Sequence, residues 1–229
     1  LTVALGTVIG VGGLVEWAAG TVDGPGRWEV HAGGVFTWAG EMSPGFEPSI
    51  YGGITVLSGG VLNVVGDTYK VMWGSCSVTN RGRINWLGAD IAMAAGAMIV
   101  NEAGGVLDVQ CDRSVNGTQI HGTGEWINHG TLLKTAGTGA TTFNAALSNF
   151  GTILFEKGSI HFNDQYYLQP SSTLRFKLGG TQPGTDFGQA YFARPWDPTN
   201  HVVSAEVSGG FLPPAGTQFL VICKGLAHI

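Results

Sequence analysis

The sequence predicts an all-β fold, a β-solenoid of about seven to eight coils with a C-terminal β cap. Three observations predict it. Glycine supplies 38 of the 229 residues, against a usual share of about 7%, and it is accompanied by Val, Ile, Leu, Thr and Trp, which favour strands. A short glycine-led segment recurs along the chain. Within each copy of that segment, apolar and polar residues alternate.

The recurring segment has eight copies, spaced 21 to 26 residues apart. Their leading residues are Gly13, Gly34, Gly60, Gly82, Gly105, Gly130, Gly151 and Ser172. Two positions later every copy has an apolar residue: Val15, Phe36, Leu62, Ile84, Leu107, Leu132, Ile153 and Leu174. Four positions later seven of the eight are apolar, and the exception is Lys134. This alternation is typical of a strand with one face in a core.

The repeat length decides between solenoid types. Glycine at this density destabilises helices, which excludes helical repeats, and the fixed leucine and asparagine spacing of leucine-rich repeats is absent. Each coil should therefore consist of two or three short strands, stacked about 4.8 Å above the previous coil. Lys134 is expected either to bend outward or to mark a local change in strand geometry.

Asparagine precedes the leading glycine, or its neighbour Gly104, in four copies. These residues are Asn80, Asn101, Asn128 and Asn149. Asparagine tolerates left-handed backbone angles at a bend, and stacked asparagines can hydrogen-bond from coil to coil. We therefore expect these residues to turn the same corner in successive coils and to form a ladder.

Two irregular stretches set the expected organisation of the chain. The segment EMSPGFEPSIY lengthens one repeat and predicts an inserted loop near residues 41–52. The repeat ends near Gly179. We therefore assign residues 1–179 to the solenoid coils and residues 180–229 to capping strands, because the open end of a repeat stack needs a cover.

Charge, hydropathy and cysteine usage exclude several classes of function. The net charge is −5 and the basic residues are scattered, which argues against nucleic-acid partners and anionic membranes. The apolar run at residues 91–100 is too short for a transmembrane helix. The first twenty residues lack the basic start of a signal peptide. Cys76, Cys111 and Cys223 have no zinc-site spacing and are expected to fill the core, with a Cys76–Cys111 disulfide left open.

An acidic residue takes the same place in four successive repeats. These residues are Glu41, Asp67, Asp90 and Asp112. Carboxylates stacked about 5 Å apart repel each other unless a cation or a basic partner intervenes. The preferred interpretation is a corner whose unusual backbone angles suit Asp and Gly. The alternatives are a Ca²⁺ site, which would be the only cofactor, and the acid–base pair of a glycan-cleaving enzyme.

The tryptophans fall into two groups. Three occupy the inward position and predict an aromatic core stack: Trp17, Trp38 and Trp86. Four lie off that position and are candidates for exposed contact with carbohydrate: Trp28, Trp73, Trp126 and Trp196. His121 and His129 lie near Glu125 in the densest titratable group, but no Ser or Cys nucleophile has an evident partner set.

Three parts of the chain carry a family resemblance. They are VTNRGRINWLGADIAMAAGAMIVNEAGGVLDV (78–109), WINHGTLLKTAGTGATTFNAALSNFGTILFEKGSIHF (126–162) and a tail made of STLRFKLGGTQPGTDFGQ (172–189) and GGFLPPAGTQFLVI (209–222). They resemble the pectin-lyase-like β-solenoid regions of large secreted and surface proteins of bacteria, including autotransporter-type passenger regions. The resemblance covers roughly residues 55–222. It implies an extracellular right-handed parallel β-helix used for display, adhesion or glycan contact, and it carries no catalytic residue across.

The expected function is therefore a non-enzymatic, extracellular structural or adhesive segment of a larger surface protein or assembly. Strand edges at the two ends of a solenoid pair readily, so the expected partners are further copies of the chain, other surface proteins or a carbohydrate. The alternative is a polysaccharide lyase, a glycoside hydrolase or a glycan-binding module. That alternative requires a groove in which acids, a base and aromatic residues converge.

Overall fold

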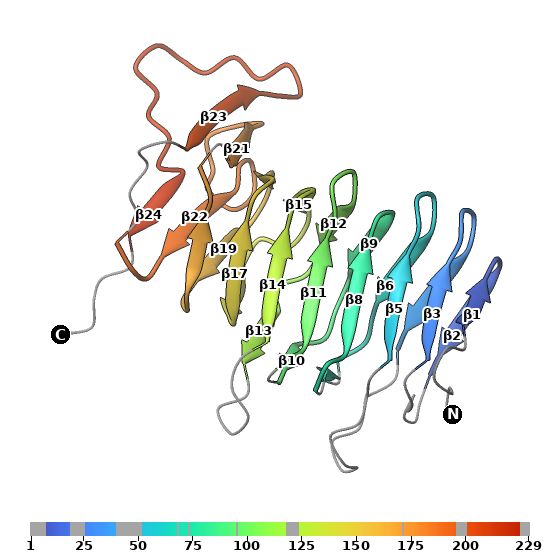
Figure 1. Ribbon diagram of the computed structural model, residues 1–229. Helices are drawn as coiled ribbons and strands as arrows, with labels where there is room; N and C mark the ends of the chain where they lie inside the picture. The colour runs from blue at the N-terminus through green and yellow to red at the C-terminus, as the bar shows by residue number, and fades with distance from the viewer. Residues whose placement is uncertain are drawn as a thin grey trace.

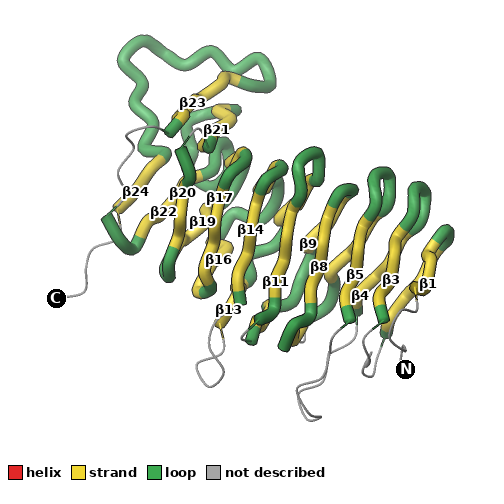
Figure 2. Tube along the Cα trace, in the orientation of Figure 1, coloured by secondary structure: helices red, strands yellow, loops and turns green. Residues whose placement is uncertain are grey.

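The computed structural model describes residues 8–18, 26–39, 52–67, 69–72, 74–94, 96–117, 124–170, 172–195 and 201–224. These residues form strands and turns without a helix, and every pairing between named strands is parallel. The strands stack into three sheets that run along the molecule (Figures 1 and 2). The predicted all-β solenoid is confirmed, with about six turns that contribute a strand to all three sheets.

The three sheets take their strands in rotation. The first sheet contains β1 (Val8–Val11), β3 (Arg27–Val30), β5 (Gly53–Val56), β8 (Ser77–Asn80), β11 (Met98–Asn101), β14 (Glu125–Asn128), β17 (Ala146–Asn149) and β20 (Tyr166–Leu168). The second sheet contains β2 (Leu14–Trp17), β4 (Val35–Trp38), β6 (Val61–Val64), β9 (Arg83–Trp86), β12 (Val106–Val109), β15 (Thr131–Lys134), β18 (Thr152–Phe155), β21 (Thr173–Leu178) and β23 (Val202–Val207). The third sheet contains β7 (Lys70–Met72), β10 (Ile91–Met93), β13 (Ser114–Gly117), β16 (Ala140–Asn144), β19 (Ser159–Phe162), β22 (Gln189–Phe192) and β24 (Ile222–Lys224).

The predicted apolar row runs unbroken along the second sheet. Val15 pairs with Phe36, and the same position pairs from strand to strand as far as Leu174. All members from Phe36 to Leu174 are buried, and Val15 at the N-terminal end is half-buried. The row is confirmed, because a parallel stack keeps the side chain of each coil against the equivalent side chain of the next.

The predicted aromatic core is confirmed as well. Trp17 stacks on Trp38 with ring centroids 6.1 Å apart. Further along the stack, Trp86 lies 6.0 Å from Trp126, and Trp126 packs edge-on against Phe143. Such ring pairs contribute beyond the area that they bury, so the interior contains a broken column of aromatic side chains.

The asparagine ladder forms at the ends of the first-sheet strands. Asn80 donates to Asn101 (2.7 Å), Asn101 to Asn128 (2.7 Å) and Asn128 to Asn149 (2.6 Å). All four side chains are buried. The expected left-handed backbone is wrong: among the described non-glycine residues only Ala89 has a positive φ, of 65°. The asparagines keep the extended backbone of their strands.

The chain continues to add parallel strands after Gly179. Strand β22 extends the third sheet, β23 extends the second sheet beyond β21, and β24 follows β22. Between β23 and β24 the chain swings away from the stack (Figure 1). The division at residues 179 and 180 stays a prediction. The expected insertion near residues 41–52 lies outside the described residues, except for Gly52.

Candidate functional site

Three residues of the predicted acidic column lie among the described residues, where the second sheet turns toward the third; Glu41 lies outside them. Asp67 forms an ion pair with Arg113. Asp90 Oδ1 accepts a hydrogen bond from the Ser114 backbone N–H at 2.6 Å. None of the three aspartates has a positive φ, so the expected unusual backbone angles are wrong for them. We call Asp67, Asp90 and Asp112 the acidic corner.

Asp112 binds a lysine from the next coil. Lys134 Nζ lies 2.9 Å from Asp112 Oδ1, 3.0 Å from the Cys111 carbonyl oxygen and 3.0 Å from the Ala136 carbonyl oxygen. The lysine side chain is 0% exposed, so the expected outward bend is wrong. An ammonium has three donors, and each finds an oxygen here. This is why the charge can stay inside.

Glycine makes room for this ion pair. A Cβ at Gly137 would lie 2.2 Å from Asp112 Oδ1, and Gly137 has a φ of 77° that other residues rarely adopt. The Gly139 N–H donates to Asp112 Oδ2 at 3.0 Å. The loop after β15 therefore wraps closely around the carboxylate.

The acidic corner has its cationic partners within the protein. Arg113 and Lys134 neutralise Asp67 and Asp112, which is one of the two ways in which stacked carboxylates are tolerated. Within the described ranges, no three His, Cys, Asp or Glu side chains come close enough together to hold a metal ion. Calcium at this corner stays a prediction.

Two further charged residues were missed by sequence reasoning. Lys70, the first residue of β7, is buried and donates to the Ala39 carbonyl oxygen at 2.8 Å. Asp108 lies on the outward side of β12, yet it is buried under Arg83, Gln110 and Thr135, all of which donate to its carboxylate. Neither partner set is visible in the sequence, because each joins different coils.

The structure describes two of the four tryptophans proposed to contact carbohydrate, Trp28 and Trp126. Trp73 and Trp196 lie outside the described residues. Trp126 is 1% exposed, so its expected exposure is wrong. The outward position on β14 belongs to its neighbour Glu125, and the indole points into the core. Trp28 is half-buried and packs edge-on against Phe36, with ring centroids 5.3 Å apart.

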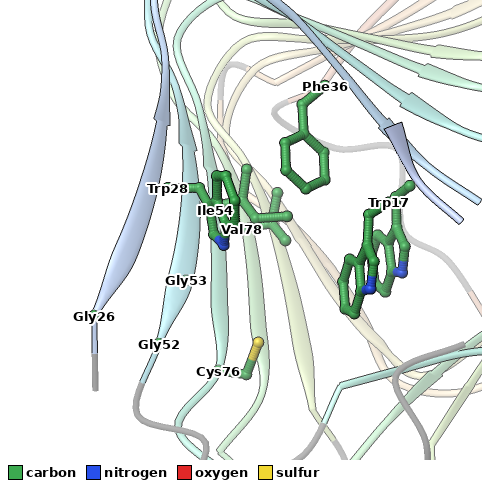
Figure 3. Close-up of a pocket in the computed structure, with 10 residues that line it drawn as sticks. Trp17, Gly26, Trp28, Phe36, Gly52, Gly53, Ile54, Cys76 and Val78 are labelled. Atoms are coloured by element: carbon green, nitrogen blue, oxygen red, sulfur yellow. The ribbon is translucent and has the colours of Figure 1, made fainter. Parts of the chain in front are cut away.

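Trp28 lines a small cavity near the N-terminal end of the stack (Figure 3). The other side chains around it are those of Trp17, Phe36, Trp38, Ile54, Cys76 and Val78. The cavity volume is about 20 Å³. The indole nitrogens of Trp28 and Trp38 are buried without a hydrogen-bond partner in the described part of the chain. A cavity of this size holds about one water molecule and is too small for a sugar ring.

A second group of polar side chains lies on the outward face of the third sheet. Ser159 Oγ lies 3.1 Å from His161 Nε2, and the His161 ring lies 4.4 Å from the Tyr191 ring. Partial burial lowers the pKa of His161. Cys223 pairs in register with Tyr191 and, through a hydrogen bond, raises the pKa of its phenol. Sequence reasoning missed this group, since its members meet only through the register of β19, β22 and β24.

We call Ser159, His161, Tyr191 and Cys223 the outward group; it contains part of the side-chain set of a hydrolase. A serine hydroxyl beside a histidine nitrogen can pass its proton to that nitrogen. A catalytic histidine also needs an acceptor that orients its ring, and no carboxylate in the described ranges forms an ion pair with His161. Of the titratable group noted in the sequence, His121 lies outside the described residues, His129 stacks on Phe150, and Glu125 accepts a hydrogen bond from Ser148.

The three cysteines are free thiols. Burial raises the pKa of Cys76 and of Cys111 to about 12, so both are poor nucleophiles at neutral pH. Both fill the core as expected, whereas Cys223 is half-buried on β24. The disulfide between Cys76 and Cys111 that the spacing left open is not formed.

Comparison with known proteins identifies no relative: no family model, no curated protein and no solved structure matches the chain. The described parts of the chain contain no helix with the length and apolar character needed to cross a membrane.

Proposed function

We propose that the protein is a non-enzymatic structural or adhesive β-solenoid segment of a larger extracellular surface protein or assembly. One observation carries the proposal: charged side chains that could serve as catalytic groups or metal ligands form ion pairs with each other between coils. Lys134 binds Asp112, Arg113 binds Asp67, and Arg83 binds Asp108. Each pair joins residues at least 22 positions apart. These three ion pairs link one coil to another.

The interior supports the same proposal. A continuous apolar row and an amide ladder each run in register through successive coils, and aromatic side chains from different sheets pack in the same core. Stacked amide side chains stabilise long β assemblies. A rod with such a core suits a protein that displays or spaces other parts at a surface. The resemblance to solenoid regions of bacterial surface proteins favours the extracellular setting.

The experiment is a glycan panel. The purified chain is incubated with acidic and neutral polysaccharides, and new reducing ends and unsaturated products are measured, with binding recorded on a glycan array. We expect no cleavage. Binding without cleavage would assign the adhesive role to carbohydrate. Cleavage that persists through purification and disappears in a variant of the outward group would overturn the non-enzymatic proposal.

The second candidate function is a glycan-processing β-helix, and the contact between Ser159 and His161 favours it. On this hypothesis, Ser159 and His161 perform the proton transfer while Tyr191 provides a ring against which a sugar stacks. His161→Ala then abolishes any cleavage found in the panel. Thr142→Ala, in the paired position on β16, is the matched control.

A further inference from the structure

A broad hollow lies on the outward face of the second sheet, where β18, β21 and β23 are neighbours. Its lining residues are Thr152, Thr173, Arg175, Ser204, Ala205 and Glu206. The volume of the hollow is about 430 Å³, against about 20 Å³ for the cavity beside Trp28. Pockets that bind small organic ligands have volumes of about 300–1,000 Å³. The hollow therefore has the room for a small ligand that the Trp28 cavity lacks.

The strand register explains why these side chains face away from the core. Thr173 and Arg175 alternate along β21 with buried residues. Thr152 pairs with Thr173, and Ser204 pairs with Arg175, so both neighbours lie on the same outward side. Strands are added to the sheet along the axis of the stack (Figure 1), so a further strand beyond β23 would lie beside the hollow and not over it.

Hydroxyl groups from three strands line the hollow. Thr152 and Thr173 occupy one row on neighbouring strands, which lie about 4.8 Å apart. Ser204 lies on the third strand, opposite Arg175. Each hydroxyl can both donate and accept a hydrogen bond. The lining thus offers polar contacts at regular intervals across the three strands.

An ion pair completes the lining. Arg175 donates to the Glu206 carboxylate, which joins β21 to β23. The two side chains are 47% and 35% exposed, so both remain accessible to a ligand. A guanidinium has several N–H donors and a carboxylate has several acceptor positions. The contact between Arg175 and Glu206 therefore leaves donors and acceptors available on both side chains.

The balance of these groups selects a neutral ligand that both donates and accepts hydrogen bonds. The charges of Arg175 and Glu206 cancel, and the neighbouring Lys177 is paired with Glu156. An anion would compete with Glu206 for the guanidinium, and a cation would compete with Arg175 for the carboxylate. The hydroxyl groups of a neutral sugar can use the donors, the acceptors and the hydroxyls of the lining without that competition.

We propose that this hollow binds a neutral saccharide unit of a glycan. The inference rests on the adhesive role in the proposed function, and it names the ligand class and the surface that binds it. It places carbohydrate contact on the second sheet, whereas the outward group lies on the third.

The test compares two threonines of the same outward row. Thr173→Val replaces a hydroxyl by a methyl group inside the hollow. Thr131→Val makes the same change on β15, where Thr131 pairs with Thr152 but does not line the hollow. An array of neutral gluco-, galacto- and manno-oligosaccharides, with uronate-containing ones beside them, should show binding of the wild-type chain to a neutral member. Titration calorimetry with that oligosaccharide should give a Kd about tenfold higher for Thr173→Val and an unchanged Kd for Thr131→Val.

Arg175→Met is the second variant and should raise the Kd by about tenfold or more, because it removes charged donors. Melting curves check that each variant folds. Binding to no neutral oligosaccharide, or only to uronate-containing ones, would overturn the neutral-saccharide site. Neutral binding that Thr173→Val and Arg175→Met both retain would also overturn it, while the adhesive function would stand. Cleavage of an oligosaccharide is the separate result that overturns the proposed function.

Discussion

Lys134 and Asp112 form a buried ion pair between adjacent coils, with Lys134 Nζ 2.9 Å from Asp112 Oδ1. The two partners are not equivalent. The lysine is fully buried, whereas the aspartate side chain is 36% exposed and also accepts from the Gly139 N–H. The Cys111 carbonyl that accepts from Lys134 also accepts from Thr141 Oγ1 at 2.6 Å. Removing the Asp112 carboxylate therefore leaves a buried ammonium without its counter-charge. Removing the Lys134 ammonium leaves a carboxylate that is partly exposed.

This asymmetry predicts unequal effects on stability. Asp112→Ala leaves an unpaired ammonium in the core and should lower the free energy of unfolding by about 3–5 kcal/mol. Lys134→Met keeps the volume of the side chain and should cost clearly less. Urea unfolding of both variants measures the difference. Equal losses, or a greater loss in Lys134→Met, would contradict the assignment.

A calcium titration tests the acidic corner. A cation that binds the native state raises Tm with its concentration. Because Lys134 and Arg113 already pair with Asp112 and Asp67, we expect millimolar Ca²⁺ to leave the Tm of the wild-type chain unchanged. An increase that the Asp90→Asn variant removes would place the ion at this corner and restore the calcium hypothesis.

Two adjacent leucines on β15 test which face of the strand points into the core. Leu132 is buried in the apolar row, while Leu133 faces outward. Leu132→Ala should destabilise the protein by about 2–5 kcal/mol, because it removes core contacts and leaves a cavity. Leu133→Ala is the matched control and should cost less than about 1 kcal/mol. Thermal unfolding of the two variants compares them, and similar losses would argue against the solenoid.

Breaking the buried asparagine ladder should destabilise the protein more than breaking the outer asparagine contacts of the third sheet. Asn128 accepts from Asn101 and donates to Asn149 and to the Thr152 carbonyl, all within the core. Asn128→Ala orphans buried polar groups and should cost about 1–3 kcal/mol for each. Asn144→Ala interrupts the Asn116–Asn144 contact, which is partly buried, and the Asn144–Asn163 contact, which is exposed, so water can substitute there. Denaturant unfolding should rank Asn128→Ala as the more damaging change.

His161 predicts a pH dependence. Burial lowers the pKa of His161 in the folded protein below its ordinary value of 6.5, so between these two values the unfolded chain binds more protons. Its contribution to stability is therefore complete above about pH 6.5 and is lost as the pH falls through the folded pKa. Melting curves at pH 7.5 and about pH 5 should differ less in His161→Gln than in the wild-type chain. An unchanged difference would show that His161 does not contribute.

The sequence by itself determined the solenoid, the inward row from Val15 to Leu174 and the asparagine ladder. These features repeat once in every coil, and a parallel stack brings equivalent positions together whatever the details of the loops. The period of two within each strand likewise separated inward Leu132 from outward Leu133. Periodicity was enough because each residue meets its own counterpart in the next coil.

Only the tertiary structure decided which unlike residues meet. Asp67 reaches Arg113, which lies 46 positions later, and Lys134 turns back to Asp112 inside the core. Trp126 faces inward because β14 belongs to the first sheet, where it pairs with the buried Ile99 and Leu147. His161 meets Tyr191 only through the register of the third sheet. Corners and connections vary in length from coil to coil. The contacts they create are therefore set by the folded path of the chain, which no repeat in the sequence encodes.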